Sequence, residues 1–349
     1  MTTPVCSTLR RFAPLFGCAR PFHQPPAHGL TRLEALAVWL RTCVAVQLGT
    51  VLLVQALTRW RRHQLTPFVI LAMPRSGSTM LATALNAHGS ISCAGEALNR
   101  RYEWYGDPSH FGPRRRRLHV RATLAACWLG SGLHSHCVGL KVLDEQLRRY
   151  YGQSAAPLHS LLADVGATCR VVLCVRHNLL ESYVSLQRAH ATGVWFREAC
   201  AVLGNAAQDH GQGEHRLPQG QLLVSPADLC RHVRETRAFW RRTVAADAAA
   251  CGALLVSYEE LRCADARAPT LARLARHLLA GGGGGGAEGH DEEQQVAAML
   301  GAACSCAKLE ERPMAERVRN FDELRLGAAL DKGVFELRLR LPGATSSTT

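Results

Sequence analysis

The chain has 349 residues and a formal net charge of +13, with 41 Lys and Arg residues against 28 Asp and Glu residues. This length suffices to bury a sizeable core and predicts one large domain, or one domain with extensions, rather than two catalytic domains. The positive charge alone does not distinguish a nucleic acid, an anionic membrane surface and a small anionic ligand as partners. Aromatic residues make up only 6% of the chain, which argues against a base-stacking surface, so we expect no nucleic-acid partner.

Fourteen cysteines are scattered along the chain rather than paired at the spacings of zinc ligands. The closest two, Cys304 and Cys306, have no second pair nearby, so we predict no metal site. Cys169 and Cys174 flank an apolar run, which is typical of small core residues.

The first 62 residues fall into two parts. Residues 1–33 contain four arginines, several prolines and no acidic residue, which predicts a disordered or targeting tail. Residues 34–62 predict an apolar helix whose uncharged part, Thr42–Leu57, would span ~24 Å, less than the ~30 Å hydrocarbon core of a membrane. Three interpretations of this helix compete: a signal anchor, a cleaved transit or signal segment, and an amphipathic helix packed on the domain.

The stretch Pro67–Leu85 (PFVILAMPRSGSTMLATAL) predicts a strand, a tight turn and a helix. Phe68–Ala72 is uncharged and mostly branched or aromatic, as in a parallel strand buried on both faces. At such a junction, backbone N–H groups and the positive end of the helix dipole favour an anion. The turn adds a permanent cation and three hydroxyl donors: Arg75, Ser76, Ser78 and Thr79. The sequence therefore predicts a phosphate or sulfate site, although an ordinary turn whose serines cap the helix has the same pattern.

Two short strands are predicted in the next part of the chain. Residues 88–99 indicate a loop and a short strand that ends at Gly95-Glu96, and Val138–Leu143 is a further strand candidate. Between them, the four consecutive arginines Arg114–Arg117 fit a solvated basic face better than a binding patch for an anionic substrate.

The second half of the chain again alternates strands and helices. Arg170–Val175 is a strongly apolar strand, and Arg176-His177-Asn178 follows at its carboxyl end, the edge where ligands bind in open α/β sheets. The remaining predicted elements are a helix over Leu179–Arg188, a helix over Ala227–Ala249, a strand over Ala253–Tyr258, a flexible glycine-rich loop over 281–291 and a disordered tail over 341–349. Strands that are each followed by a helix indicate a parallel sheet covered by helices, so the predicted fold class is α/β.

Taken together, these motifs resemble the sulfotransferase superfamily that uses 3′-phosphoadenylyl sulfate (PAPS), and within it the bacterial-type carbohydrate and glycolipid sulfotransferases. Four pieces carry the resemblance, PRSGSTMLATALNAHGSISCAGEALN, VGLKV, CVRHNLLESYVSLQRAHATGVW and LLVSYEELR, and VRNFDEL is a weaker fifth. The resemblance implies a P-loop-like three-layer sandwich, with a central parallel sheet covered by helices, as a sulfotransferase domain over residues 63–340.

The resemblance also implies a reaction and a set of site residues. The reaction is transfer of the sulfuryl group of PAPS to a hydroxyl of a carbohydrate or glycolipid acceptor, without a metal. The residues that match the family's 5′-phosphosulfate loop are Arg75, Ser76, Gly77, Ser78 and Thr79, and those that match its 3′-phosphate clamp are Arg176 and Ser185. Arg75 would stabilise the leaving group. Glu96 corresponds to the acceptor base, and a surface or helix-capping glutamate is the alternative at that position.

The clamp departs from the family pattern. Close relatives place the arginine eight residues before the serine, whereas Arg176 lies nine residues before Ser185 and His177 occupies the nearer position. We favour Arg176 as the ligand of the 3′-phosphate, because His177 would bind it more weakly and only when protonated.

Two other functions stay open at this point. The first is a P-loop-type nucleotide kinase, which is disfavoured because the turn lacks the GxxxxGK[ST] form whose lysine reaches the outer phosphates. The second is a non-catalytic, anion-binding relative of the sulfotransferases. A signal anchor over 34–62 would place the enzyme in the Golgi membrane; without an anchor, we expect a soluble cytoplasmic or organellar protein.

Overall fold

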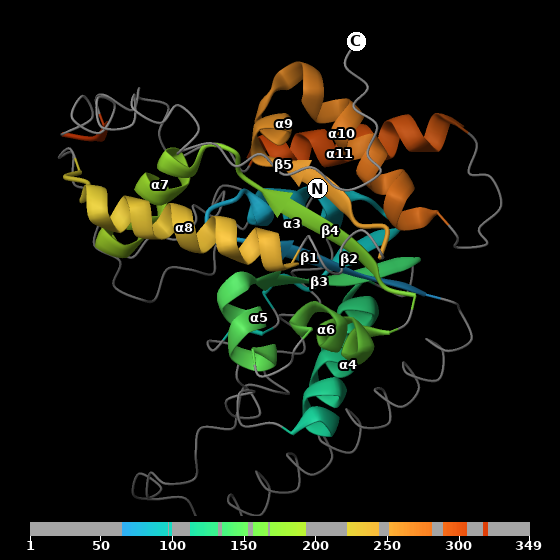
Figure 1. Cartoon of the computed structure of the whole chain (residues 1–349). Coiled ribbons are helices and arrows are strands. Elements are labelled where there is room, and N and C mark those ends of the chain that lie inside the picture. Colours follow the sequence, from blue (N-terminus) through green and yellow to red (C-terminus); the bar gives the residue numbers. More distant parts are fainter. Residues whose placement is uncertain are drawn as a thin grey trace, which may run out of the picture.

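The computed structural model describes residues 65–96, 98–99, 112–131, 135–152, 156–166, 168–192, 222–243, 251–280, 289–305 and 317–319. The described strands are β1 (Thr66–Ala72), β2 (Ile91–Cys93), β3 (Cys137–Leu143), β4 (Arg170–Val175) and β5 (Leu254–Ser257). They form one sheet in the order β2-β3-β1-β4-β5, and every neighbouring pair is parallel. The predicted α/β fold with a central parallel sheet is confirmed (Figure 1).

Helices cover both faces of the sheet and complete three layers (Figure 1). One face carries α4 (Pro113–Gly130), α5 (Asp144–Tyr151), α6 (Pro157–Val165), α7 (Leu179–Thr192) and α8 (Pro226–Thr243). The other face carries α3 (Ser78–Ala87), α9 (Tyr258–Arg262), α10 (Ala264–Leu279) and α11 (Gly289–Ser305). In β1, Leu71 packs into the first core and Ile70 into the second, because successive side chains of a strand point to opposite faces.

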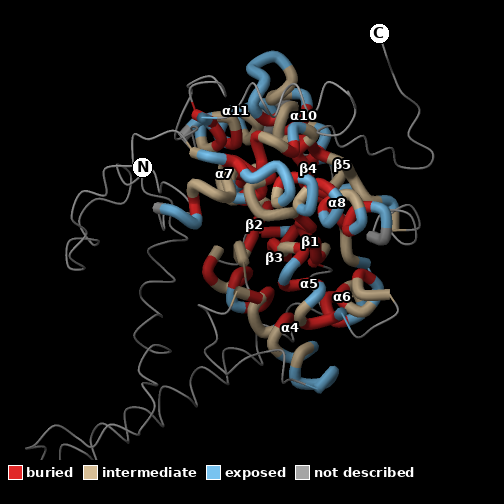
Figure 2. Tube along the Cα trace, turned by 60° about the vertical axis from the view of Figure 1, so that its left-hand side comes forward, coloured by how far each residue is buried: buried red, intermediate tan, exposed pale blue. Residues whose placement is uncertain are grey.

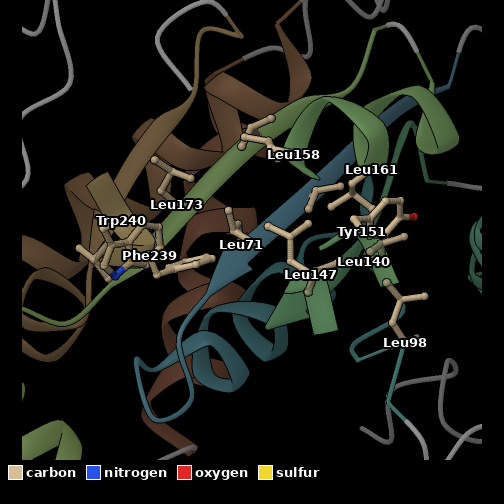
Figure 3. Packing of buried hydrophobic residues seen from close by; sticks show 14 of the residues in the cluster. Leu71, Leu98, Leu140, Leu147, Tyr151, Leu158, Leu161, Leu173, Phe239 and Trp240 are labelled. Carbon is tan, nitrogen blue, oxygen red and sulfur yellow. The ribbon is translucent and has the colours of Figure 1, made fainter. Parts of the chain in front are cut away.

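The strands are the most deeply buried part of the chain (Figure 2). On the α4 to α8 side, Leu71, Leu140 and Leu173 from three neighbouring strands belong to the same core as Tyr151 and Trp240 (Figure 3). Full burial of side chains of this size contributes about 1.5–3 kcal/mol each. These contacts hold the strand ends, and therefore the loops that follow them, in fixed positions.

The carboxyl ends of three strands meet at one edge of the sheet. Ala72 of β1 pairs with Leu143 of β3 on one side and with Cys174 of β4 on the other. The chain leaves β1 through α3 towards β2, whereas β4 lies on the opposite side of β1. Crevices at such a change of direction are where ligands bind in α/β sheets.

One residue of the arginine run, Arg116, has a different role from the one we predicted. Arg114–Arg117 lie at the start of α4, and the Nε of Arg116 lies 2.8 Å from a carboxylate oxygen of the buried Asp164. The guanidinium of Arg116 also lies over the ring of Tyr151, 4.1 Å from its centroid. The prediction of a solvated face is therefore wrong for Arg116, which joins α4 to α5 and α6, while the other three arginines are exposed as predicted.

Two other boundaries can be compared with the prediction. Helix α11 begins at Gly289, so the last three residues of the loop predicted over 281–291 are helical, and residues 281–288 lie outside the described residues. Helix α8 confirms the helix predicted over Ala227–Ala249 as far as Thr243, and residues 244–250 are not among those described.

The predicted segments 1–33, 34–62 and 341–349 also lie outside the described residues. In the described part of the chain, no helix combines the length and the apolar character needed to cross a membrane. The same part contains no group of three His, Cys, Asp or Glu side chains arranged to hold a metal ion.

Candidate active site

The turn after β1 has the backbone geometry of a tight anion-binding loop. Arg75 and Gly77 have φ values of 64° and 85°, in the left-handed region that glycine adopts readily and other residues rarely do. A Cβ at Gly77 would lie 2.5 Å from the ring of Tyr258, so glycine is required there for space as well. No side chain caps the N-terminus of α3 among the described residues. Its first N–H groups can therefore face a ligand.

The hydroxyl groups of this turn are not equivalent. Ser76 and Ser78 are 1% and 4% exposed, and the Oγ of Ser76 lies 3.8 Å from the sulfur of Cys174 in β4. Thr79 is exposed, and its Oγ1 accepts a hydrogen bond of 3.0 Å from the Nζ of Lys141. Of the three hydroxyl groups predicted to face an anion, Thr79 is therefore the one at the surface.

The structure brings the predicted loop and the predicted clamp together. Arg75 Nε donates to Ser185 Oγ at 2.9 Å, although the two residues are 110 positions apart. Arg176 Nη1 donates to the backbone oxygen of Arg75 at 3.0 Å. Burial lowers the pKa of Arg75, and the nearby Arg176 lowers it further. An arginine remains protonated under such shifts, so the guanidinium group of Arg75 keeps its charge.

Arg176 is the more deeply placed of the two clamp candidates. It is 6% exposed, its Nη2 lies 2.8 Å from the carboxylate of Glu181, and its guanidinium stacks 4.2 Å from the centroid of the Tyr258 ring. Its Nε has no hydrogen-bond partner among the described residues. His177, in contrast, is half-buried, and its backbone N–H donates to the carboxylate of Glu259.

The carboxylate of Glu181 lies close to several arginines beside this clamp. Besides Arg176, Arg317 and Arg262 lie 3.6 and 3.8 Å from Glu181. Burial lowers the pKa of Arg317, while Glu181 raises it and Arg176 lowers it further. Arg317 is held here because its backbone oxygen accepts from the N–H of Leu222 at 2.9 Å. The group has more positive than negative charge, which suits a doubly charged phosphate.

Glu181 and Arg317 were not predicted as site residues. The sequence indicates a role for Arg317 only weakly, because this residue directly precedes VRNFDEL, the weakest of the five pieces that resemble the sulfotransferases. The signal for Glu181 was a carboxylate in the first turn of the helix that carries Ser185.

The N-terminus of α7 is already occupied by groups of the protein itself. The carboxylate of Glu259 accepts from the N–H groups of His177 and Asn178, at 3.0 and 3.1 Å, and the side chain of Asn178 accepts from the N–H of Glu181. These contacts satisfy the donors that an uncapped helix would offer to an anion. A phosphate at this end of the site must therefore be held by side chains rather than by the α7 backbone.

A second group of charged side chains surrounds Glu96. The Nζ of Lys141 lies 2.7 Å from Glu96 Oε1, and the side-chain amide of Asn99 donates to Glu96 Oε2 at 2.9 Å. Because Lys141 also donates to Thr79, it connects the predicted acceptor base to the predicted phosphosulfate loop. Lys141 lies on β3 and is 4% exposed, whereas the Glu96 side chain is 21% exposed.

Lys141 belongs to the motif VGLKV, but no role was predicted for it. A lysine within a buried strand is a signal in itself, because a buried ammonium group requires a partner. The partners, Thr79 and Glu96, lie in two other segments, and the sequence does not show that these segments meet on β3.

Comparisons with known proteins test the family resemblance. Residues 67–234 match the Sulfotransferase family. Nodulation protein H of Rhizobium meliloti (strain 1021) is 31% identical over 133 residues, which are 38% of this chain and 50% of that protein. The chain thus spans about half the length of this curated relative.

Among solved structures, the sulfotransferase STF9 from Mycobacterium avium is 12% identical, with 97% of this chain and 98% of that chain covered and a TM-score of 0.41. The segment that matches the family contains the turn after β1, Glu96, Lys141, Arg176 and Ser185. The predicted resemblance is confirmed for residues 67–234, which carry the sequence pattern of the sulfotransferase superfamily.

Proposed function

We propose that this protein transfers the sulfuryl group of PAPS to a hydroxyl of a carbohydrate or glycolipid acceptor. The observation that carries the proposal is the position of Lys141, whose Nζ contacts both Thr79 of the anion-binding turn and Glu96. In-line transfer to a hydroxyl requires a cation, donors such as an uncapped helix N-terminus, and a base, and here the base would be the partly exposed carboxylate of Glu96.

The 5′-phosphosulfate end of the donor would lie against residues 75–79. The N-terminus of α3 and the hydroxyl of Thr79 would bind its oxygens, and Arg75 would add a permanent positive charge. Ser76 and Ser78 would support the turn from within the core, since their side chains are buried. Gly77 would allow the backbone to turn under the ring of Tyr258.

The 3′-phosphate would lie between Arg176 and Ser185, which are connected through Arg75. The Nε of Arg176 is a buried donor without a partner among the described residues, and a phosphate oxygen would satisfy it. His177 is a less suitable ligand because its backbone is tied to Glu259. Arg317, from the C-terminal part of the chain, would place a further positive charge near the same phosphate.

In the transfer step, the acceptor oxygen forms a bond to sulfur while the bond between sulfur and the bridging oxygen of the 5′-phosphate breaks. Glu96 takes the acceptor proton, and the bridging oxygen leaves with 3′-phosphoadenosine 5′-phosphate. Each Glu96 oxygen accepts one hydrogen bond in the structure, from Lys141 or Asn99, and a carboxylate oxygen has a second lone pair for the acceptor hydroxyl. Lys141 would stabilise the charge that develops on the transferred group.

The test uses the full chain with sulfur-radiolabelled PAPS and a panel of glycans and glycolipids, in the absence of added metal. We expect a labelled product, and we expect its loss in Arg75→Ala but not in Arg234→Ala, an exposed arginine of α8. Donor binding without any labelled product would favour the non-catalytic alternative. Absence of donor binding together with magnesium-dependent ATP turnover would favour the kinase instead.

Attachment to a Golgi membrane is a separate proposal that rests on the sequence of residues 34–62 alone. In cells that express the full chain, a signal anchor would keep the protein in the membrane fraction after carbonate extraction, and deletion of 34–62 would release it. Release of the full chain by carbonate would contradict the anchor.

A further inference from the structure

A cavity of about 250 Å³ lies between helices α7 and α8, away from the residues discussed so far. Its lining consists of polar side chains, from Tyr183, Gln187, Asp228, Arg231, His232 and Glu235. At ~30 Å³ for each water molecule in the liquid, this volume equals about eight waters. The cavity can therefore hold one ring-sized polar ligand.

Helix α7 separates this cavity from the predicted donor site. Ser185, which contacts Arg75, lies two residues after Tyr183 and two residues before Gln187. Two residues correspond to ~200° around a helix, so Tyr183 and Gln187 lie on the side of α7 opposite Ser185. With a helix diameter of ~10 Å, a ligand in the cavity would lie about one helix width from the donor clamp.

The charge of the cavity differs from that of the donor clamp. Its lining has two carboxylates and one guanidinium, and Arg231 is paired with Asp228. Burial lowers the pKa of His232, while the nearby Glu235 raises it, so this imidazole is neutral at pH 7. A lining with one net negative charge disfavours phosphates and sulfates. It suits a neutral ligand that both donates and accepts hydrogen bonds.

The lining also offers the contacts that a sugar ring uses. Gln187 and the two carboxylates can bind hydroxyl groups, and the buried Nε2 of His232 has no hydrogen-bond partner among the described residues. The rings of Tyr183 and His232 pack against each other, with their centroids 5.4 Å apart and their planes at an angle of 48°. Polar side chains placed in this way fix the orientation of a bound small molecule.

We propose that this cavity binds a neutral, non-reacting sugar residue of the acceptor, a role that rests on the function proposed above. The sheet order sets the minimum length of such an acceptor. Lys141 lies on β3, and α7 follows β4. Because β1 lies between β3 and β4, these two strands are two strand spacings apart, ~9.5 Å, and the width of α7 adds to this distance. An acceptor that reaches from Glu96 to the cavity is therefore an oligosaccharide rather than a monosaccharide.

The test measures transfer and binding with the full chain. The acceptors are neutral monosaccharides and neutral di- to tetrasaccharides of hexoses and N-acetylhexosamines, and the variants are Gln187→Ala and His232→Phe. Both variants should raise KM for the longer acceptors about tenfold, as expected for loss of one buried hydrogen bond. The kcat, the KM for monosaccharides and the affinity for 3′-phosphoadenosine 5′-phosphate should not change. Arg234→Ala, an exposed position on α8, is the matched control.

Saturation-transfer NMR with the same unlabelled oligosaccharides separates this proposal from the proposed function. Signals from the longer sugars that disappear in both variants would support the cavity even if the wild type transfers no sulfuryl group. Unchanged signals and unchanged KM in both correctly folded variants would overturn the cavity proposal, even if wild-type transfer is rapid. Equal effects on monosaccharides and oligosaccharides would also overturn it, because the ligand would then be the reacting sugar.

Discussion

The two charged groups at the carboxyl edge of the sheet differ in how their charge is balanced. After β4, the carboxylate of Glu181 lies near three arginines, Arg176, Arg262 and Arg317. After β2 and on β3, the single carboxylate of Glu96 lies against the single ammonium group of Lys141. Among the described side chains that these ion pairs join, the first group has an excess of positive charge and the second is neutral.

On the proposed function, the two groups would have different roles. Buried excess charge is unfavourable without a counter-ion, so the arginine group would bind the anionic donor. A neutral pair attracts an anion less, but its carboxylate can take a proton while its ammonium group stabilises developing charge. Substitutions at the two groups should therefore separate donor affinity from turnover.

The largest expected effect is on stability, in Glu181→Ala. The change removes the carboxylate shared by buried arginines, and loss of one partner of a buried ion pair costs about 3–5 kcal/mol in the free energy of unfolding. Addition of 3′-phosphoadenosine 5′-phosphate should restore part of this loss because its phosphate supplies the missing negative charge. Urea denaturation with and without the nucleotide measures both quantities. A loss below 1 kcal/mol, equal to that of the exposed control Glu145→Ala, would contradict the proposed charge excess.

Lys141→Ala should act mainly on turnover. We expect kcat to fall by about 10²–10³, the range found when one preorganised donor to a developing charge is removed. Affinity for 3′-phosphoadenosine 5′-phosphate should stay close to the wild-type value, since that product lacks the transferred group. Steady-state kinetics and calorimetry on the same preparation provide the comparison. An equal loss in both quantities would show that Lys141 belongs to donor binding instead.

Arg176→Ala should show the opposite pattern. Loss of a charged hydrogen bond of about 1.5–3 kcal/mol predicts a 10- to 10²-fold weaker affinity for 3′-phosphoadenosine 5′-phosphate. Affinity for adenosine 5′-phosphate, which lacks the 3′-phosphate, should change much less. His177→Ala is the neighbouring control, and we expect it to bind both nucleotides as the wild type does. If His177→Ala binds 3′-phosphoadenosine 5′-phosphate more weakly than Arg176→Ala does, His177 rather than Arg176 holds the 3′-phosphate, contrary to the proposal.

The smallest effect concerns His232, which lies outside both charged groups. Burial lowers its pKa in the folded state, so the unfolded chain, with a pKa of about 6.5, binds the proton more readily. The contribution of the neutral imidazole to the free energy of unfolding is therefore fully present above about pH 6.5, and it is lost as the pH falls through the folded pKa. The free energy of unfolding of His232→Gln, measured between pH 7.5 and 5, should therefore fall less steeply with decreasing pH than that of the wild type. An unchanged decline would mean that other groups cause it.

The fold could be predicted from local patterns where those patterns are strong. Phe68–Ala72 and Arg170–Val175 are uncharged except at one end, and both are buried strands in the structure. Helix α4 was not predicted, because its first turns are an arginine run whose partner, Asp164, lies more than forty residues away. Helix α11 was not predicted because it begins directly after a glycine tract that resembles only a loop.

The candidate site shows the same limit. The turn residues and the clamp could be named because each follows a recognisable strand, and the hydrogen bond from Arg75 to Ser185 shows that the two segments meet. Lys141, Glu181 and Arg317 could not be assigned, since each acts through contacts between segments that are distant in the sequence. Local pattern identifies strand ends, whereas charge balance depends on the tertiary arrangement.

The most direct test of the transfer centre is single-turnover transfer from radiolabelled PAPS in the wild type, in Glu96→Gln and in Glu145→Gln. Glutamine keeps the shape of the side chain but is a much weaker base, so Glu96→Gln should lower the transfer rate by about 10²–10⁴ and leave donor affinity unchanged. The exposed Glu145→Gln should transfer at the wild-type rate. A wild-type rate in Glu96→Gln, or a parallel loss of donor affinity, would contradict the role of Glu96 as the acceptor base.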